Sequence, residues 1–284
     1  MCPEFFRLGS FALRAWGVAL TLSFFLGLWL LKFEARALRL NYDRLFNLGF
    51  LVSFVGVVGA RLAYVVFHFS EFADKPLNII NPLAVEGQFG IAGMNLYGGI
   101  ILAVVVAIIY LSRRRLSILD HADAVVVALA FGIFLSRIGC FLNGCCFGTP
   151  TGSFLGMVFP PDSPAGWVYP GEHIHPAQLY ASGLGLLLFF VLRRVNRHRR
   201  FSGQAFALFF MLQSAFRFFL EFIRYYEPAM TLGSQVGGFT YNQVIAVAFF
   251  LFGATIYLVG LKKVRGTAAP NRELEPNKPD KNGR

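Results

Sequence analysis

Residues 121–140 read HADAVVVALAFGIFLSRIGC, a run of mostly apolar side chains that contains a single arginine, Arg137. An α-helix that crosses the hydrocarbon core of a bilayer needs about 20 mostly apolar residues. This stretch has that length and that composition. It therefore predicts a membrane-spanning helix, and it sets the pattern to look for in the rest of the chain.

Further stretches of the same kind precede and follow it. Together they give seven expected spans, at residues 10–32, 45–67, 91–111, 121–140, 176–192, 203–223 and 240–261. Of the 284 residues, 56% are hydrophobic and 14% are charged, which is more apolar surface than one soluble core can bury. The sequence therefore predicts an all-α integral membrane protein of about seven helices, and it argues against a soluble, disordered or fibrous chain.

The chain nevertheless carries a formal net charge of +11, from 26 Lys and Arg against 15 Asp and Glu. Most of these cations follow the first, third, fifth and seventh expected spans, and these loops lie on one side of the membrane. Because positively charged loops remain in the cytoplasm, we expect the N-terminus outside, in the periplasm, and the C-terminus inside. Membrane orientation accounts for the basic runs, so we expect no nucleic-acid partner.

The expected domain organisation is simple. Residues 1–265 form one polytopic membrane domain, and residues 266–284 form a polar, disordered cytoplasmic tail that contains three prolines. No internal repeat and no second domain are expected.

Three arginines, Arg61, Arg137 and Arg217, fall well inside the expected spans, and a fourth, Arg224, directly follows the sixth span. Each costs about 3 kcal/mol to place in a bilayer, and the expected orientation puts all of them in the outer half of the membrane. Glu221, on the same helix face as Arg217 and Arg224, cannot neutralise four guanidinium groups. Surplus buried charge predicts an anionic ligand, and in the outer leaflet that ligand is a phospholipid phosphate. The alternative is that individual arginines snorkel or bind carbonyls at helix ends.

Other polar side chains are expected at the same depth. Tyr97 and Tyr180 lie near the outer ends of their spans, and Asn143 follows the fourth span, where it could donate a hydrogen bond to a phosphate or to a leaving oxygen. His175 precedes the fifth span and is the histidine best placed for acid–base work. A role in capping backbone groups fits His175 equally well.

The loop after the fourth span contains three cysteines, Cys140, Cys145 and Cys146. We expect no metal, because Cys145 and Cys146 are adjacent and no CxxC pair exists. A disulfide from Cys140 to one of the other two suits the oxidising side of the membrane. A reactive thiol is the third interpretation, because the nearby charge of Arg137 would lower its pKa, and simple packing of the thiols is equally compatible with the sequence.

Five motifs carry a family resemblance: residues 59–64 (GARLAY), 97–99 (YGG), 137–144 (RIGCFLNG), 175–180 (HPAQLY) and 216–224 (FRFFLEFIR). Their order and spacing, with seven spans and an outside N-terminus, resemble the prolipoprotein diacylglyceryl transferases. The resemblance extends from about Trp16 to the end of the seventh span.

The resemblance implies a multi-pass transferase of the bacterial inner membrane whose active site faces the outer leaflet. Such an enzyme transfers the diacylglyceryl group of phosphatidylglycerol to the lipobox cysteine of a prelipoprotein, making a thioether and releasing glycerol phosphate. The resemblance implies no cofactor. By the motif match, Arg137 and Asn143 would hold the lipid head group, and Arg217, Glu221 and Arg224 would shape the leaving-group site. With the residues selected above by position, the candidate catalytic residues are Arg137, Arg217, Tyr97 and His175, and the candidate lipid-binding residues are Arg61, Arg137, Asn143, Gly144, Glu221 and Arg224.

Several positions differ from the family pattern. Tyr97 replaces the histidine of the family's His-Gly-Gly, and Cys145 replaces the glutamate of its Asn-Gly-Glu. Three further differences are Ala181 in place of Glu, Gln213 in place of Tyr and Trp16 in place of Tyr. The phosphate-binding arginines are therefore kept, whereas the positions that would handle protons are changed.

Three hypotheses follow from this pattern. The first is an active diacylglyceryl transferase, or a relative with the same donor, in which His175 or Tyr97 handles the proton. The second is a non-catalytic membrane protein that binds or transports phospholipid at the same anion site. In a variant of the first, Cys145 or Cys146 is a nucleophile that carries the lipid transiently.

Overall fold

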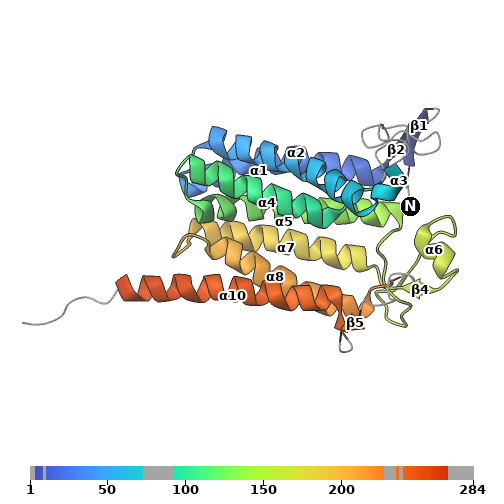
Figure 1. Ribbon diagram of the computed structural model, residues 1–284. Helices are drawn as coiled ribbons and strands as arrows, with labels where there is room; N and C mark the ends of the chain where they lie inside the picture. The colour runs from blue at the N-terminus through green and yellow to red at the C-terminus, as the bar shows by residue number, and fades with distance from the viewer. Residues whose placement is uncertain (1–3, 9–10, 73–92, 227–234, 237–238, 268–284) are drawn as a thin grey trace, which may run out of the picture.

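The computed structural model describes residues 4–8, 11–72, 93–226, 235–236 and 239–267 (Figure 1). Seven helices in this part of the chain are long and apolar enough to cross a membrane. They are α1 (Ala15–Leu38), α2 (Tyr42–Phe67), α4 (Leu96–Arg113), α5 (Ile118–Asn143), α7 (Ala177–Arg197), α8 (Gln204–Leu220, continued by the 3-10 turn η2 at Glu221–Ile223) and α10 (Tyr241–Thr267). The all-α membrane architecture and the order of its spans are confirmed. The side on which each terminus lies stays a prediction.

Short elements gather at one end of the bundle (Figure 1). They include three antiparallel strand pairs and two short helices. These elements are β1 (Glu4–Leu8) with β2 (Phe11–Arg14), β3 (Met157–Val158) with β4 (His173–Ile174), β5 (Gln235–Val236) with β6 (Phe239–Thr240), α3 (Phe69–Phe72) and α6 (Pro164–Val168). This is the end at which α5 ends and α7 begins.

Several helices extend beyond the expected spans, and two of the expected starts lie several residues too early in the chain. The first span was expected from residue 10, but residues 11–14 form β2 and take their hydrogen bonds from β1, so the helix begins at Ala15. The third was expected from residue 91, but the Asn95 side chain accepts hydrogen bonds from the N–H groups of Tyr97 and Gly98 at 3.0 and 3.3 Å. Asn95 is therefore an N-cap, and the helix begins after it. At the other end of the chain, α10 continues to Thr267, and residues 268–284 of the expected tail lie outside the described residues.

Helix α5 occupies the centre of the bundle. It packs against α1, α7 and α8, while α2 pairs with α4 and α8 pairs with α10. Close approach requires small residues in places: a Cβ at Gly185 of α7 would lie 2.6 Å from the backbone nitrogen of Phe134 in α5. Buried Val127, Leu188 and Leu192 form the centre of the apolar core between these helices.

At the end opposite the short strands, a buried carboxylate holds the start of α8. Asp123 is fully buried and accepts hydrogen bonds from the N–H groups of Gly203 and Phe206, both at 2.8 Å. Its third partner is Arg199, with Nη1 3.0 Å from Oδ2. The negative charge lies at a helix N-terminus, where free N–H groups and the helix dipole stabilise it.

Glu34 of α1 extends this polar group. It lies 3.2 Å from Nε of Arg193 and accepts a hydrogen bond of 2.9 Å from Nδ2 of Asn196. The paired cluster, as we call it, comprises Glu34, Asp123, Arg193, Asn196 and Arg199. Arg193 and Arg199, which the sequence analysis assigned to membrane orientation, are therefore also ion-paired.

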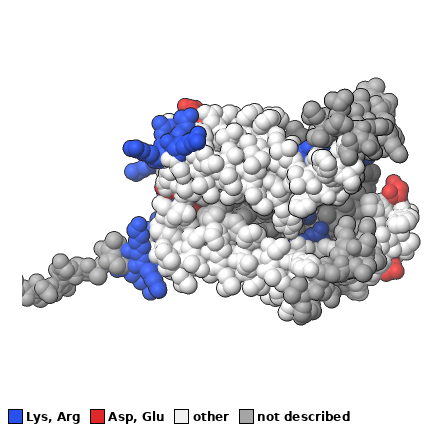
Figure 2. Space-filling view, viewed as in Figure 1, with Lys and Arg blue, Asp and Glu red and all other residues white. Residues whose placement is uncertain are grey.

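Lys and Arg side chains gather at this same end, and a second, smaller group lies recessed between helices towards the other end (Figure 2). The large group coincides with the loops that follow α1 and α4 and with the end of α10. The sorting of charge expected from the sequence is thus present in the structure.

Candidate functional site

Glu221 organises the polar groups at the end of α8. Only 5% of its surface is exposed, and its Oε2 lies 3.0 Å from Nη2 of Arg217, one helical turn earlier. Its Oε1 accepts hydrogen bonds from Tyr226, from Asn242 at 3.0 Å and from Thr240 at 3.1 Å. The Glu221 network, meaning these five residues, neutralises one arginine and fills the remaining acceptor sites with neutral donors.

Arg224 also lies against the Glu221 network, but no carboxylate in the described part of the chain pairs with it. Its guanidinium carbon is 5.2 Å from the centroid of the Tyr226 ring, while Arg217 donates a 3.2 Å hydrogen bond to the Tyr226 hydroxyl. Nε of Arg224 is buried and has no hydrogen-bond partner in the part of the chain that the structure describes. A buried charged donor without an acceptor is costly, so this arrangement favours an anionic ligand.

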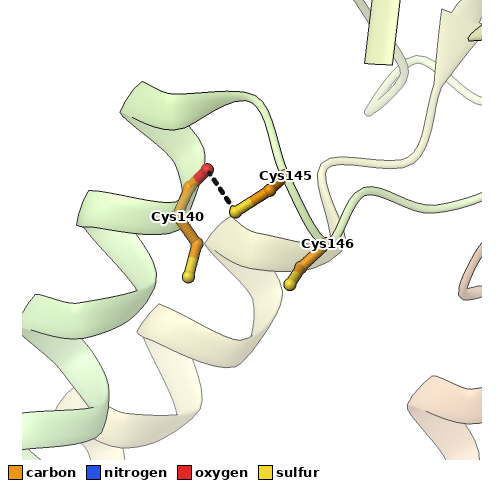
Figure 3. Close-up of side chains that lie close together, drawn as sticks. All are labelled: Cys140, Cys145 and Cys146. Atoms are coloured by element: carbon orange, nitrogen blue, oxygen red, sulfur yellow. Dashed lines mark hydrogen bonds between the residues drawn. The ribbon is translucent and has the colours of Figure 1, made fainter. Parts of the chain in front are cut away.

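The three cysteines lie close together beside α5 (Figure 3). Cys140 lies in the last turn of the helix, and Gly144 ends the helix in the left-handed conformation at φ 71°. Cys146 is also left-handed, at φ 61°, and this turns the chain back towards Cys140. The three sulfur atoms lie within 4.8 Å of one another, and each thiol is free.

Positive charge surrounds the last of these thiols. Hydrogen bonds from Cys140 and Cys145, together with the charges of Arg224 and Arg137, lower the pKa of the Cys146 thiol. Two guanidinium groups, one from α5 and one from the segment after η2, thus stabilise the thiolate form of the same cysteine. This connects Arg137 with Arg224, although the sequence places them 87 residues apart.

The chain after the cysteines is fixed by backbone pairing with two distant segments. The N–H of Thr149 donates to the carbonyl oxygen of Ile223 at 2.8 Å, and the N–H of Gly148 donates to that of His175 at 3.0 Å. Gly148 also forms a β-bridge with Arg224. A Cβ at Gly148 would lie 2.6 Å from the carbonyl oxygen of Ile223, so a larger residue would push the segments apart. These bonds hold the cysteine loop, the His175 segment and the Arg224 segment together.

Arg61 does not join this group through any contact described for it. Its Nη1 donates to the carbonyl oxygen of Gly93 at 3.0 Å, and its guanidinium carbon lies 5.1 Å from the Phe72 ring centroid. This geometry favours the alternative interpretation of Arg61, in which an arginine binds a carbonyl near a helix end.

The two residues expected to handle protons differ in position. Tyr97 is 53% exposed, and its hydroxyl lies 3.5 Å from Oδ1 of Asn242, at the edge of the Glu221 network. His175 is half-buried, and its Nδ1 lies 3.2 Å from the Tyr180 hydroxyl. Asn143 is the last residue of α5 and is half-buried at the start of the cysteine loop.

Four functional residues were missed by sequence reasoning. Gln178 is fully buried and donates from Nε2 to the carbonyl oxygen of Cys145 at 2.8 Å, which fixes the cysteine loop. Tyr226, Thr240 and Asn242 complete the Glu221 network. Gln178 lies in a motif that the sequence analysis quoted. The other three have neutral side chains, and no pattern in the sequence connects them with Glu221.

These features define an integral membrane protein with a group of arginines at one end of its helical bundle, beside a cluster of thiols, as a candidate anion-binding site. More particularly, the chain belongs to the prolipoprotein diacylglyceryl transferase family, whose model matches residues 3–259. The expected family and its transferase class are confirmed.

Individual relatives of this chain are named as diacylglyceryl transferases. The chain is 33% identical to the phosphatidylglycerol–prolipoprotein diacylglyceryl transferase of Geobacter sulfurreducens, over 92% of this chain and 96% of that protein. It is 36% identical to the enzyme of Bordetella bronchiseptica, over 72% of this chain and 74% of that protein. It is 29% identical to the enzyme of Clostridium tetani, over 79% of this chain and 86% of that protein. The comparisons favour the transferase over the non-catalytic hypothesis.

Proposed function

We propose that this protein transfers the diacylglyceryl group of phosphatidylglycerol to the thiol of a prelipoprotein lipobox cysteine. The site faces the outer leaflet of the bacterial inner membrane, with the N-terminus outside and the C-terminus in the cytoplasm. The membrane domain, expected over residues 1–265, includes α10 to its end at Thr267, and the tail follows it.

One observation carries this proposal. Glu221 pairs with Arg217, whereas no carboxylate in the described ranges pairs with Arg224 or Arg137. Two buried or half-buried guanidinium groups therefore have charge left for a ligand, and their forked donors match the oxygens of a phosphate. In a protein of this family, the phosphate is that of the lipid donor.

The chemistry explains why arginines are needed. The acceptor thiolate attacks the glyceryl carbon that bears the phosphate, a C–S bond forms, and the C–O bond to the phosphate breaks. Negative charge develops on the departing glycerol phosphate, and guanidinium groups already in position stabilise it. Arg137 and Asn143 hold the head group, while Arg217 and Arg224, with Glu221, form the leaving-group site.

An apolar cavity offers a place for a short part of an acyl chain. It has a volume of about 150 Å³, lies between α8 and α10, and is lined by residues such as Ser214, Phe218 and Phe250. Ser214 and Phe218 flank Arg217 in the sequence. A chain in this cavity keeps its apolar surface away from water while the head group lies at the arginines.

Complementation tests the proposal. The gene is expressed in a bacterium depleted of its own transferase, with a lipobox reporter protein whose mass is measured. We expect a diacylglyceryl adduct on the lipobox cysteine, and no adduct on a matched reporter with serine at that position. If the protein is present in the membrane and the reporter stays unmodified, the proposal is wrong; co-purified phospholipid in that case would support the non-catalytic hypothesis.

A further inference from the structure

The cysteine cluster has the donors of a metal site. Three thiol sulfurs lie within 4.8 Å of one another, with Cys140 buried and the other two half-buried (Figure 3). Thiolates that bind one tetrahedral Zn²⁺ have Zn–S bonds of about 2.3 Å, which places the sulfurs about 3.8 Å apart. Small rotations of the three cysteine side chains would bring the sulfur atoms to this separation.

The backbone holds the cluster in place. The left-handed turns at Gly144 and Cys146 return the chain to α5, and the N–H of Cys145 donates to the carbonyl oxygen of Cys140 at 3.2 Å. Buried Gln178 of α7 holds the carbonyl oxygen of Cys145 from the other side. The sequence analysis discounted a metal because two cysteines are adjacent, but this turn brings both of them to Cys140.

Within the described residues, the group of possible ligands contains these three cysteines and no fourth member. Structural zinc sites have four protein ligands, whereas catalytic sites have three and leave the fourth position to water or substrate. Three thiolates and Zn²⁺ carry a net charge of −1, and the neighbouring Arg137 and Arg224 are cations that stabilise it.

We propose that Cys140, Cys145 and Cys146 bind Zn²⁺ and that the fourth coordination position takes the thiol of the acceptor cysteine. This inference rests on the transferase function proposed above and specifies how its acceptor is activated. The β-bridge between Gly148 and Arg224 places this metal site next to the leaving-group site.

The reaction then balances without any oxidant or reductant. The acceptor thiol binds Zn²⁺ and loses its proton to water, because a thiol that coordinates zinc is deprotonated. The sulfur lone pair forms the C–S bond to the glyceryl carbon, and the C–O electron pair leaves with glycerol phosphate. The sulfur of the thioether product carries no negative charge and binds zinc weakly, because the form of cysteine that binds a metal is the thiolate. The product therefore leaves the metal. Such a site supplies the thiolate in a chain that has Tyr97 and Cys145 where the family has histidine and glutamate.

Metal binding is measured first, on the full-length wild-type protein purified in detergent under reducing conditions. We expect one Zn²⁺ per chain after removal of excess metal. Titration with Co²⁺ in its place should give the intense sulfur-to-metal charge-transfer absorption and the visible bands of a tetrahedral thiolate site. A protein that holds neither ion, or in which two of the three thiols are oxidised to a disulfide, overturns the inference without any variant.

Substitutions locate the ligands. Cys140→Ser, Cys145→Ser and Cys146→Ser should each reduce Zn²⁺ affinity at least tenfold and weaken the charge-transfer band in proportion to the thiolates lost. Cys2→Ser removes the fourth cysteine of the chain and is the matched control, with unchanged stoichiometry expected. Equal metal binding by all four variants would refute the site.

The last measurement separates this inference from the proposed function. Transfer to a lipobox peptide is assayed before and after a chelator, and again after Zn²⁺ is restored. We expect loss and recovery of transfer, and a shift of the Co²⁺ bands when the peptide binds but not when its serine analogue binds. Full transfer by metal-free protein refutes the zinc site and leaves the transferase intact, whereas zinc-loaded protein that never transfers refutes the transferase.

Discussion

The two ends of the helical bundle differ in how far their buried charged groups have partners within the described part of the protein. In the paired cluster, Asp123 and Glu34 are matched by arginines and by N–H donors at distances of 2.8 to 3.2 Å. At the other end, Glu221 matches Arg217, and the buried Nε of Arg224 has no partner among the described residues. Charge that the protein itself satisfies stabilises the fold, whereas charge that it leaves unsatisfied is available to a ligand.

The largest expected effect comes from breaking the paired cluster. Asp123→Ala leaves two buried backbone N–H groups without an acceptor and removes one of the two carboxylates that pair with Arg199, so we expect a loss of about 3–5 kcal/mol in the free energy of unfolding. Thermal unfolding in detergent measures it. The control is Asp120→Ala, which removes a more exposed carboxylate 2.5 Å from the same arginine and should cost about 1 kcal/mol or less. Equal losses in the two variants would contradict the contrast between the ends.

At the other end, Arg137→Lys should reduce transfer to the lipobox reporter by about 100-fold or more, with little effect on unfolding. Lysine keeps the charge but cannot bind a phosphate through two parallel donors. Arg193→Lys is the matched control in the paired cluster, and it should retain transfer per folded molecule. Wild-type transfer by Arg137→Lys would remove this arginine from the phosphate site.

A smaller effect is expected from Gly148→Ala. The added Cβ would lie 2.6 Å from the carbonyl oxygen of Ile223 and would displace the cysteine loop from the Arg224 segment. We expect transfer to fall about tenfold, with a destabilisation of about 1–3 kcal/mol. Gly152→Ala tests the same change where nothing lies within 4 Å, and it should behave like wild type.

The smallest effect is expected from Tyr97→Phe. Tyr97 is 53% exposed, and within the described residues its hydroxyl makes one long hydrogen bond, of 3.5 Å to Asn242, so transfer should stay within about threefold of wild type. Asn242→Ala removes donors to both Glu221 and Tyr226 and should cost more. A large loss in Tyr97→Phe would instead assign the proton transfer to this residue.

The spans and the charged members of the site are predictable from local sequence. Hydropathy over about 20 residues locates a helix such as α5, and the cost of an arginine in a membrane draws attention to Arg137 and Arg217. The start of α1 was misplaced because the strand pairing that displaces it is a contact between segments, which hydropathy does not report.

The remaining parts of the site depend on tertiary contacts. Thr240 at the end of β6 and Asn242 at the start of α10 contact Glu221 across the fold, and their neutral side chains give no signal in the sequence. The grouping of the three cysteines depends on the left-handed backbone conformation at Cys146, which residues other than glycine rarely adopt. The pairing of Arg199 with Asp123 is hidden for another reason: a basic run after a span already has an explanation in membrane orientation.

The dependence of Glu221 on Thr240 and Asn242 bears on how the protein is made. These partners lie at and just before the start of α10, the last helix of the chain to be synthesised. A nascent chain with six helices inserted has its arginines in the membrane but lacks two of the donors that hold its buried carboxylate. The Glu221 network is therefore complete only when α10 is in place, and we expect a chain that ends before α10 to lack transferase activity.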